Sequence, residues 1–342
     1  MSGLRVQSWL GGWGSALRDA VCQPFERETG VRVEQVPHVG LKLPAALLEA
    51  LEQHTCPPID VVWSNAVPAL RAEQAGQCIP LELDARDLYA RAFAGRDAHG
   101  RGVVHPYVVY YVLVYREAAF EHGAPSSWEA LLDPRHRGKV AVYPGGNGLY
   151  PIAQVMGGGD LTAYPHELEP CWRFMQQLAP QIGELEYSIG MEEHLRSGAL
   201  DLCFRALTNA LAFRAAGLPV SWCIPNEGTT DTLDAFWIPR GTPNTAMAQR
   251  FIAFAMRPDI QTQFCKALGA MPVHRAAQIP ELLKTCAALP AHADDQHGIL
   301  SVSELVKAEH EPKLEQQFNE VIRAATDLSV TVAPRRLSVA LC

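Results

Sequence analysis

Short apolar runs alternate with amphipathic segments along the early part of the chain. The runs are rich in valine and bounded by glycine or polar residues, as in strands, whereas the segments between them carry apolar residues at helical spacing. The predicted strands are 4–9, 31–36 and 59–63, the predicted helices are 15–29, 43–53 and 67–76, and the predicted loops are 11–14 and 64–65. A repeated strand–loop–helix unit builds a parallel sheet whose loops gather at the carboxyl ends of the strands, so the pattern predicts an α/β fold.

The same alternation continues through the rest of the chain. Residues 106–116 (PYVVYYVLVYR) are apolar and aromatic throughout and too few to cross a membrane, which indicates a strand buried on both faces. Further strands are predicted at 139–143, 200–204, 220–224 and 235–238, and further helices at 192–197, 209–216, 244–256 and 259–268.

One polar segment interrupts this pattern. Residues 225–234 (PNEGTTDTLD) contain three carboxylates and separate two apolar runs that read as buried strands. A solvated surface loop is the ordinary interpretation of such a segment, because loops run over the surface. The question is whether these polar side chains face water or a bound molecule.

Length and charge narrow the function classes. The 342 residues suggest two domains, and 48% hydrophobic with 19% charged residues is a globular composition. The formal net charge is -8, and no basic stripe or aromatic-interleaved Lys/Arg cluster occurs, so we expect no nucleic-acid partner. No apolar run is long enough for a transmembrane helix.

The cysteines, the histidines and the N-terminal residues show no recognisable functional motif. The nine cysteines form no CxxC pair, and the twelve histidines show no metal-ligand spacing, so we expect no metal and no cofactor, and leave open whether any cysteines form disulfides. Nucleophile-elbow, phosphate-loop and dinucleotide motifs do not occur, and enzyme activity is not expected. Residues 1–6 lack the pattern of a secretory signal, which leaves a cytoplasmic protein or one whose signal has been removed.

Several motifs, taken in order, resemble one family. They are FERETGVRVEQV (25–36), IDVVWSN (59–65), SWEALLDPRHRGKVAV (127–142), IPNEGTTDTLDAFWIPRGTPN (224–244) and GAMPVH (269–274). The chain resembles the extracellular solute-binding proteins of ABC importers, in the branch that includes polyamine, thiamine and ferric-ion binders. The resemblance covers roughly residues 4–325.

This resemblance implies a two-lobed type 2 periplasmic-binding-protein fold. Each lobe would be a mostly parallel sheet flanked by helices, with the ligand cleft between the lobes. The lobes would comprise residues 1–107 plus 236–289 and residues 108–235 plus 290–325, followed by a tail, 326–342, to which we assign no role. The protein would be a periplasmic monomer that captures a small-molecule solute by hinge closure and passes it to an ABC permease in the membrane.

The resemblance also implies where the solute would be held. Asp234 matches the family aspartate that pairs with an amine, and Thr232 stands where polyamine binders carry an aromatic. The residues themselves add an anion site: Gly146 and Asn147 belong to the glycine-rich loop 143–148 before a helical stretch, where backbone N–H groups can approach an anion, and Arg205 follows a strand and should point into the cleft. An aspartate for an amine and these groups for an anion would suit a zwitterion. The other expected contacts are Trp9, Trp13, Ser64, Asn65, Tyr107 and Tyr110.

Three alternatives remain open from the residues. A polyamine or another small ion is one, although most of the polyamine set is missing, and residues 204–208 (FRALT) lack the paired tyrosines of ferric-ion binders. A ligand-sensing domain of the same fold is the second. The third is an enzyme that uses Asp231, Asp234 and Glu227 as general acids or bases.

Overall fold

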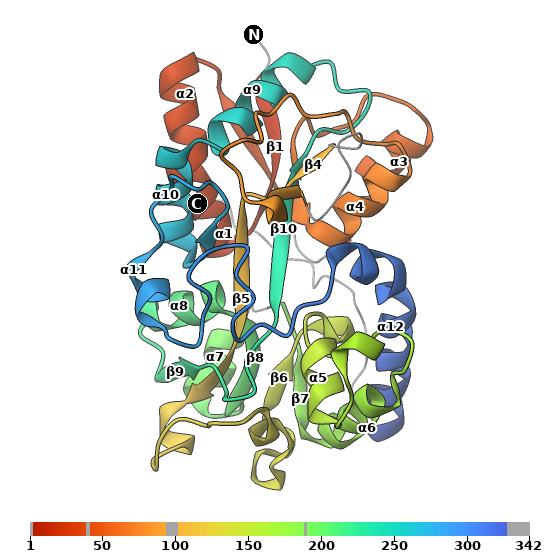
Figure 1. Ribbon diagram of the computed structural model, residues 1–342, viewed down its shortest axis with the longest axis vertical. Coiled ribbons are helices and arrows are strands. Elements are labelled where there is room, and N and C mark those ends of the chain that lie inside the picture. Colours follow the sequence, from red (N-terminus) through yellow and green to blue (C-terminus); the bar gives the residue numbers. More distant parts are fainter. Residues whose placement is uncertain (1–2, 39–41, 94–101, 188–189, 327–342) are drawn as a thin grey trace.

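The computed structural model describes residues 3–38, 42–93, 102–187 and 190–326 (Figure 1). The strands are β1 (Leu4–Trp9), β2 (Val33–His38), β3 (Val62–Asn65), β4 (Val103–Val104), β5 (Tyr107–Arg116), β6 (Val140–Val142), β7 (Ile182–Leu185), β8 (Leu202–Ala206), β9 (Val220–Cys223), β10 (Asp231–Trp237) and β11 (Met271–Pro272). The α-helices are α1 (Gly11–Leu17), α2 (Gln23–Thr29), α3 (Ala45–Glu52), α4 (Ala66–Gln74), α5 (Tyr150–Met156), α6 (Glu169–Leu178), α7 (Met191–Ser197), α8 (Leu207–Ala215), α9 (Thr245–Ala255), α10 (Pro258–Leu268), α11 (Glu281–Thr285) and α12 (Glu304–Ala325).

The elements gather into two lobes joined by two long strands. In Figure 1 the upper group, here called the first lobe, contains β1–β4 with α1–α4, α9 and α10, and the lower group, the second lobe, contains β6–β9 with α5–α8. Parallel pairing holds β1 to β2 in the first lobe, and β6 to β7 and β8 in the second. The predicted α/β class and two-lobed arrangement are therefore confirmed.

The long strands β5 and β10 are antiparallel and cross from one lobe to the other. Residues 108–110 of β5 pair with β10, whereas residues 111–116 pair with β8 and β9 of the second lobe. Strand β10 pairs with β5 up to Leu233 and with β3 of the first lobe from Asp234 onward. Both strands therefore change partner at the centre of the molecule.

Three predicted loops have a different structure. The glycine run expected as a loop at 11–14 is the start of α1, and Gly14 is needed there because a Cβ would be 2.3 Å from the carbonyl oxygen of Trp9. Ser64 and Asn65 end strand β3 rather than forming a loop, and α4 follows directly. In the polar segment 225–234, Thr229, Thr230 and Asp231 are fully buried, and β10 begins at Asp231.

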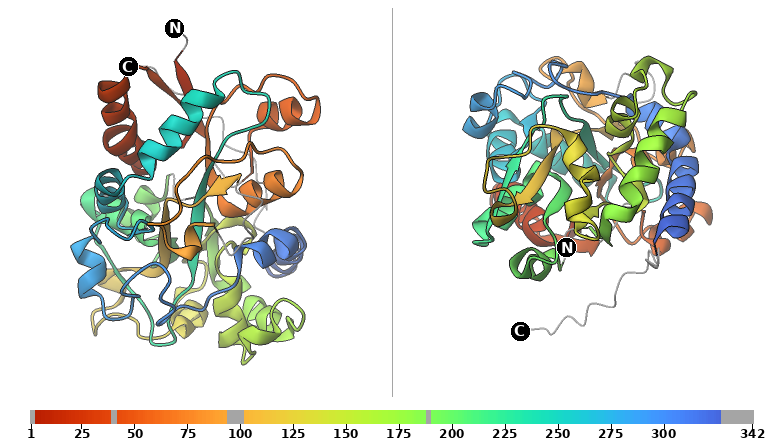
Figure 2. Two further views of the ribbon diagram at one scale, coloured as in Figure 1. Left: turned by 45° about the horizontal axis from the view of Figure 1, so that its top comes forward. Right: turned by 90° about the horizontal axis from the view of Figure 1, so that it is seen from below.

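Helix α12 packs against both lobes. It contacts α4 of the first lobe, and α6 and the turn Pro144–Gly146 of the second. Figure 2 shows it (blue) beside the yellow-green helices of the second lobe in both views. Thr326 follows its last residue, and the rest of the tail 326–342 lies outside the described residues.

A buried charged group fixes α12 to β10. The Lys307 ammonium donates to Glu304 Oε1 at 2.7 Å and to the backbone oxygen of Asp231 at 3.1 Å, and the Asp231 carboxylate forms an ion pair with Arg91. The side chains of Lys307 and Glu304 are 13% and 4% exposed. Charges this far from water persist only when they are paired, so this group ties the helix to the crossing strand.

Across the described residues, no helix combines the length and apolar character needed to span a membrane.

Candidate functional site

Asp234 lies where β10 leaves the crossing and joins the first lobe. Its Oδ2 accepts hydrogen bonds from Tyr107 Oη at 2.7 Å and from Trp9 Nε1 at 3.2 Å. Its Oδ1 accepts no hydrogen bond from any residue that the structure describes, and 6% of the residue's surface stays exposed. One carboxylate oxygen is therefore fixed by the protein and the other is left for a ligand.

Aromatic rings surround this carboxylate. The aromatic cluster consists of Trp9, Trp13, Trp63 and Tyr107, with ring centroids 6.3–6.5 Å apart. Trp63 and Tyr107 are buried, and Trp63 Nε1 donates to Tyr107 Oη, whereas Trp9 and Trp13 are partly exposed. The inner pair thus positions Asp234, whereas Trp9 directs the N–H edge of its indole at the same carboxylate oxygen and Trp13 packs against the inner pair. Sequence reasoning missed Trp63, although it precedes Asn65 by two positions and so shares its side of β3.

Burial sets the charge state of Asp234. Loss of solvent raises the pKa of its carboxyl to about 7, although the hydrogen bonds from Tyr107 and Trp9 oppose the shift. Among the described residues, none forms an ion pair with this carboxylate. Ionised Asp234 is therefore a negative charge in a largely dry site without a protein cation, which is an arrangement suited to a ligand ammonium.

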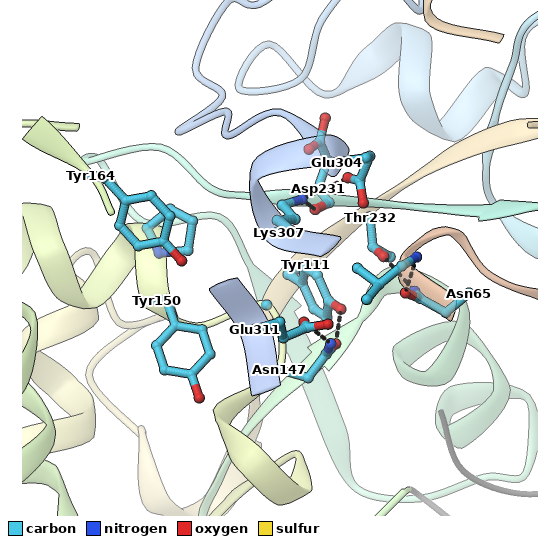
Figure 3. A pocket seen from close by; sticks show the side chains of 13 residues that line it. Asn65, Tyr111, Asn147, Tyr150, Tyr164, Asp231, Thr232, Glu304, Lys307 and Glu311 are labelled. Atoms are coloured by element: carbon cyan, nitrogen blue, oxygen red, sulfur yellow. Dashed lines mark hydrogen bonds and ion pairs between the residues drawn. The ribbon is translucent and has the colours of Figure 1, made fainter. Parts of the chain in front are cut away.

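Polar side chains continue from Asp234 along the floor of the cleft. Asn65 is the register partner of Asp234, caps α4 through its Oδ1, and donates from Nδ2 to Thr232 Oγ1 at 3.0 Å. Tyr111 Oη donates to Asn147 Oδ1 at 2.9 Å, and Asn147 Nδ2 donates to Glu311 Oε1 at 2.9 Å (Figure 3). This row connects the first lobe, the crossing strands, the second lobe and α12.

Two cavities lie along this row of polar side chains. The larger, about 440 Å³, lies between the lobes and is lined by Asn65 and Arg71 on one side, Gly145 and Asn147 on the other, and Glu311 from α12. The smaller, shown in Figure 3, has a volume of about 20 Å³, which is the space of about one water molecule. The larger cavity has the size of a small-molecule site.

Strand register decides which tyrosine of the Tyr110-Tyr111 pair faces the cleft. Tyr111 lies four positions after Tyr107, so both side chains are on the same side of β5, and Tyr111 lines the smaller cavity. Tyr110 is directed to the opposite side, opposite Asp231, and is fully buried. The prediction of Tyr110 as a wall residue is wrong, and counting alternate positions from Tyr107 would have selected Tyr111.

Several other expected contacts line neither cavity: Asp234 with Trp9, Trp13 and Tyr107 of the aromatic cluster, and also Ser64 and Gly146. Ser64, beside Asn65 but on the other side of β3, is buried and accepts a hydrogen bond from Trp237 Nε1. Gly146 is buried under α12, where a Cβ would be 2.8 Å from the Phe318 ring, and it has a φ of 67°. The glycine therefore serves the turn and the close approach of α12 rather than an anion.

Arg205 is a core residue rather than a cleft residue. It is 0% exposed, and its guanidinium donates to the carbonyls of Phe204 and Glu186 and contacts Met191 Sδ. It also lies 4.6 Å from the centroid of the Tyr143 ring. The expectation that it points into the cleft is wrong, because the carbonyls at the ends of these strands take its donors.

The three carboxylates of segment 225–234 do not converge. Glu227 accepts from Ser127 Oγ in the second lobe, Asp231 is paired with Arg91, and Asp234 lies in the aromatic cluster. They offer no shared acid–base site of the kind that the enzyme alternative requires. No set of His, Cys, Asp or Glu side chains within the described ranges is arranged to hold a metal ion.

Known proteins provide an independent comparison. Residues 20–291 match the family described as bacterial extracellular solute-binding protein. The gamma-aminobutyric acid-binding protein of Pseudomonas aeruginosa is 27% identical over 325 residues, which cover 92% of this chain and 90% of the relative. The spermidine/putrescine-binding periplasmic protein of Escherichia coli is 24% identical over 45% of this chain and 44% of its own length.

Solved structures share the fold. A periplasmic binding protein of Agrobacterium tumefaciens R10 in complex with agropinic acid aligns with a TM-score of 0.78 and 17% identity, over 94% of this chain and 99% of that one. The structure titled Atu4243-GABA receptor aligns with a TM-score of 0.77 and 20% identity, over 96% and 99%. These relatives are binding proteins, and with the family match over most of its length the chain belongs to the bacterial extracellular solute-binding proteins, the solute-capturing components of ABC transporters.

Proposed function

We propose that this protein captures a small solute that carries an ammonium group and that Asp234 binds that group. The observation that carries the proposal is the buried carboxylate with one fixed and one unoccupied oxygen and no protein cation beside it. An ammonium at Oδ1 would form a charge-assisted hydrogen bond with this carboxylate. The named solutes of the two curated relatives, gamma-aminobutyric acid and spermidine or putrescine, all bear amines.

The direct test is calorimetry with amines and matched compounds without an amine. Butylamine, γ-aminobutyrate and putrescine are the amine probes, and butyrate and butanol are the controls. At least one amine should bind with a measurable Kd, and neither control should. Binding of the controls with the affinity of the amines would refute the assignment.

Affinity for an amine should depend on pH through Asp234. Its pKa of about 7 in the free protein means that the carboxyl is mostly neutral in weakly acidic solution, whereas an alkylammonium stays charged to about pH 10. We expect affinity for butylamine to rise about tenfold per pH unit up to roughly pH 7 and to level off above it. Calorimetry from about pH 5 to 9 measures this, and a flat profile would contradict the role of Asp234.

Hinge closure follows from the two crossing strands. The proposed lobes, residues 1–107 plus 236–289 and 108–235 plus 290–325, meet where β5 and β10 change partner. A solute that contacts both lobes stabilises the closed state. We expect a smaller radius of gyration by small-angle scattering once a bound amine saturates the protein, and an unchanged radius would contradict closure.

The remaining parts of the proposal concern partners and place. The protein acts as a monomer in the periplasm and delivers its solute to an ABC permease, without catalysing a reaction. The names of the curated relatives support a binding role, and one of these names supports the periplasmic location.

A further inference from the structure

Arg71 in α4 is a charged side chain that lines the larger cavity without a full set of partners. Its Nε donates to the carbonyl of Ala308 in α12 at 2.7 Å. Its Nη2 is buried and has no hydrogen-bond partner among the described residues. No ion pair with a described carboxylate is formed either. A guanidinium stays charged at any ordinary pH, so a buried arm without an acceptor costs free energy that an anion would recover.

Arg205 shows the opposite situation. Carbonyl oxygens and a thioether occupy its donors in the core. Of these two arginines, Arg71 is the one that lines a cavity and has an unused donor, and it is half-buried, whereas Arg205 is fully buried.

Glu311 lies on the same cavity and would oppose an anion if it were charged. It already accepts a hydrogen bond from Asn147, and burial raises the pKa of its carboxyl to about 7. A carboxyl can take up a proton and then donate to an anion, whereas the guanidinium cannot lose its charge. Arg71 is therefore the group that keeps its charge at this end of the cavity, and its positive charge favours an anionic group of the ligand.

Arg71 and Asp234 are connected through Asn65. Asn65 is the register partner of Asp234 and the cap of α4. Arg71 comes six positions later in the sequence, which is about 9 Å along the axis of a helix. Asn65 and Arg71 both line the larger cavity, and Asp234 pairs with Asn65 in the sheet, so the two opposite charges belong to the same lobe on either side of Asn65.

We propose that Arg71 binds the anionic end of the solute, so that the ligand is an ω-amino acid whose ammonium lies at Asp234 and whose carboxylate lies at Arg71. This inference rests on the proposed function for the ammonium end of the solute and adds a binding group for its carboxylate end. The carboxylate would accept from the terminal nitrogens of the guanidinium, the geometry that arginine offers to carboxylates.

The test compares chains with different ends on the wild type and on two variants. The probes are β-alanine, γ-aminobutyrate and δ-aminovalerate, with butylamine and putrescine as matched compounds that lack the carboxylate. The variants are Arg71→Met and Arg71→Lys, and Arg135→Met is the control, because it removes an exposed arginine that lines neither cavity. Calorimetry gives each Kd, and thermal unfolding confirms that each variant folds.

We expect at least one ω-amino acid to bind the wild type at least about tenfold more tightly than butylamine, the scale of a hydrogen bond between charged groups. Arg71→Met should remove that advantage and leave butylamine binding unchanged, and Arg135→Met should change neither by more than about twofold. If Arg71→Met does not fold, Arg71→Lys should still weaken the ω-amino acids selectively.

Two results would overturn the assignment of Arg71 while leaving the amine site intact. One is equal binding of ω-amino acids by the wild type and the Arg71 variants. The other is tighter binding of putrescine than of every ω-amino acid. That result would mean that the second charged end of the ligand is an ammonium bound by Glu311 rather than a carboxylate bound by Arg71. If no amine probe binds the wild type, the proposed function and this inference both fail.

Discussion

Replacing Asp234 by asparagine is expected to weaken amine binding by roughly 30-fold to several thousand-fold, with the fold intact. The amide keeps the shape of the side chain but cannot supply the negative charge that a buried ammonium requires. Losing one partner of a buried charge pair costs about 2–5 kcal/mol, which gives this range. Calorimetry with the tightest-binding amine measures it, and a variant that binds as tightly as the wild type would exclude Asp234 from the site.

The same substitution should also change how stability depends on pH. Burial raises the pKa of Asp234 from its ordinary value to about 7, so the folded protein holds this proton more tightly than the unfolded chain does. The group therefore contributes stability below about pH 4 that is lost as the pH rises through about 7. Asp234→Asn should lack this loss and be more stable than the ligand-free wild type at pH 8, as measured by urea unfolding. Asp84→Asn, at an exposed aspartate paired with Arg86, is the control and should leave amine affinity unchanged.

Lys307→Met is expected to lower the free energy of unfolding by about 3–5 kcal/mol. The substitution would leave Glu304, which is 4% exposed, buried without its cation, and would remove the donor to the Asp231 carbonyl. Breaking a buried pair by removing one partner has a cost of this size, because the remaining charge has lost both water and partner. Urea unfolding followed by circular dichroism measures the change.

Two further variants separate this explanation from a general loss of charge. Lys284→Met removes an exposed lysine that is also paired three residues away, with Glu281, and should cost less than about 1 kcal/mol. The double variant Lys307→Met with Glu304→Gln should be more stable than Lys307→Met alone, because no carboxylate is then left unpaired. A Lys307→Met protein as stable as the wild type would show that this group does not hold α12 in place.

Local patterns predicted most of the elements well. Strand 4–9 has the predicted bounds, and the uniformly apolar run 106–116 is a strand with its first eight residues buried. The glycine that ends the predicted helix 15–29 is also observed: Gly30 follows α2 in the left-handed conformation, with a φ of 71°. These features depend on short-range periodicity and backbone preference, which a single sequence contains.

The site was harder to predict, because it depends on which way each strand faces. The sequence selected Asn65, Thr232 and Asn147, which line the smaller cavity, and Asp234 with Trp9, which are hydrogen-bonded to each other beside Asn65; a role in ligand binding remains a prediction for all of them. Ser64 and Tyr110 were misplaced by one position, and in a strand one position reverses the side. The orphan donor of Arg71 could not be predicted, since it depends on where α12 packs, more than two hundred residues later in the chain.

Because α12 contacts both lobes, a movement of the lobes around a bound solute should also change the surroundings of the exposed side of this helix. Its inner side carries Glu311 and Lys307 at the cavities, whereas Lys313 and Gln316 are exposed. An environment-sensitive dye at Gln316→Cys would therefore report lobe movement optically without touching the solute. Among the described cysteines Cys56 is the exposed one, and Cys342 lies outside the described residues, so Cys56→Ser with Cys342→Ser would direct the dye to the helix and convert the binding protein into a fluorescent sensor for its own ligand.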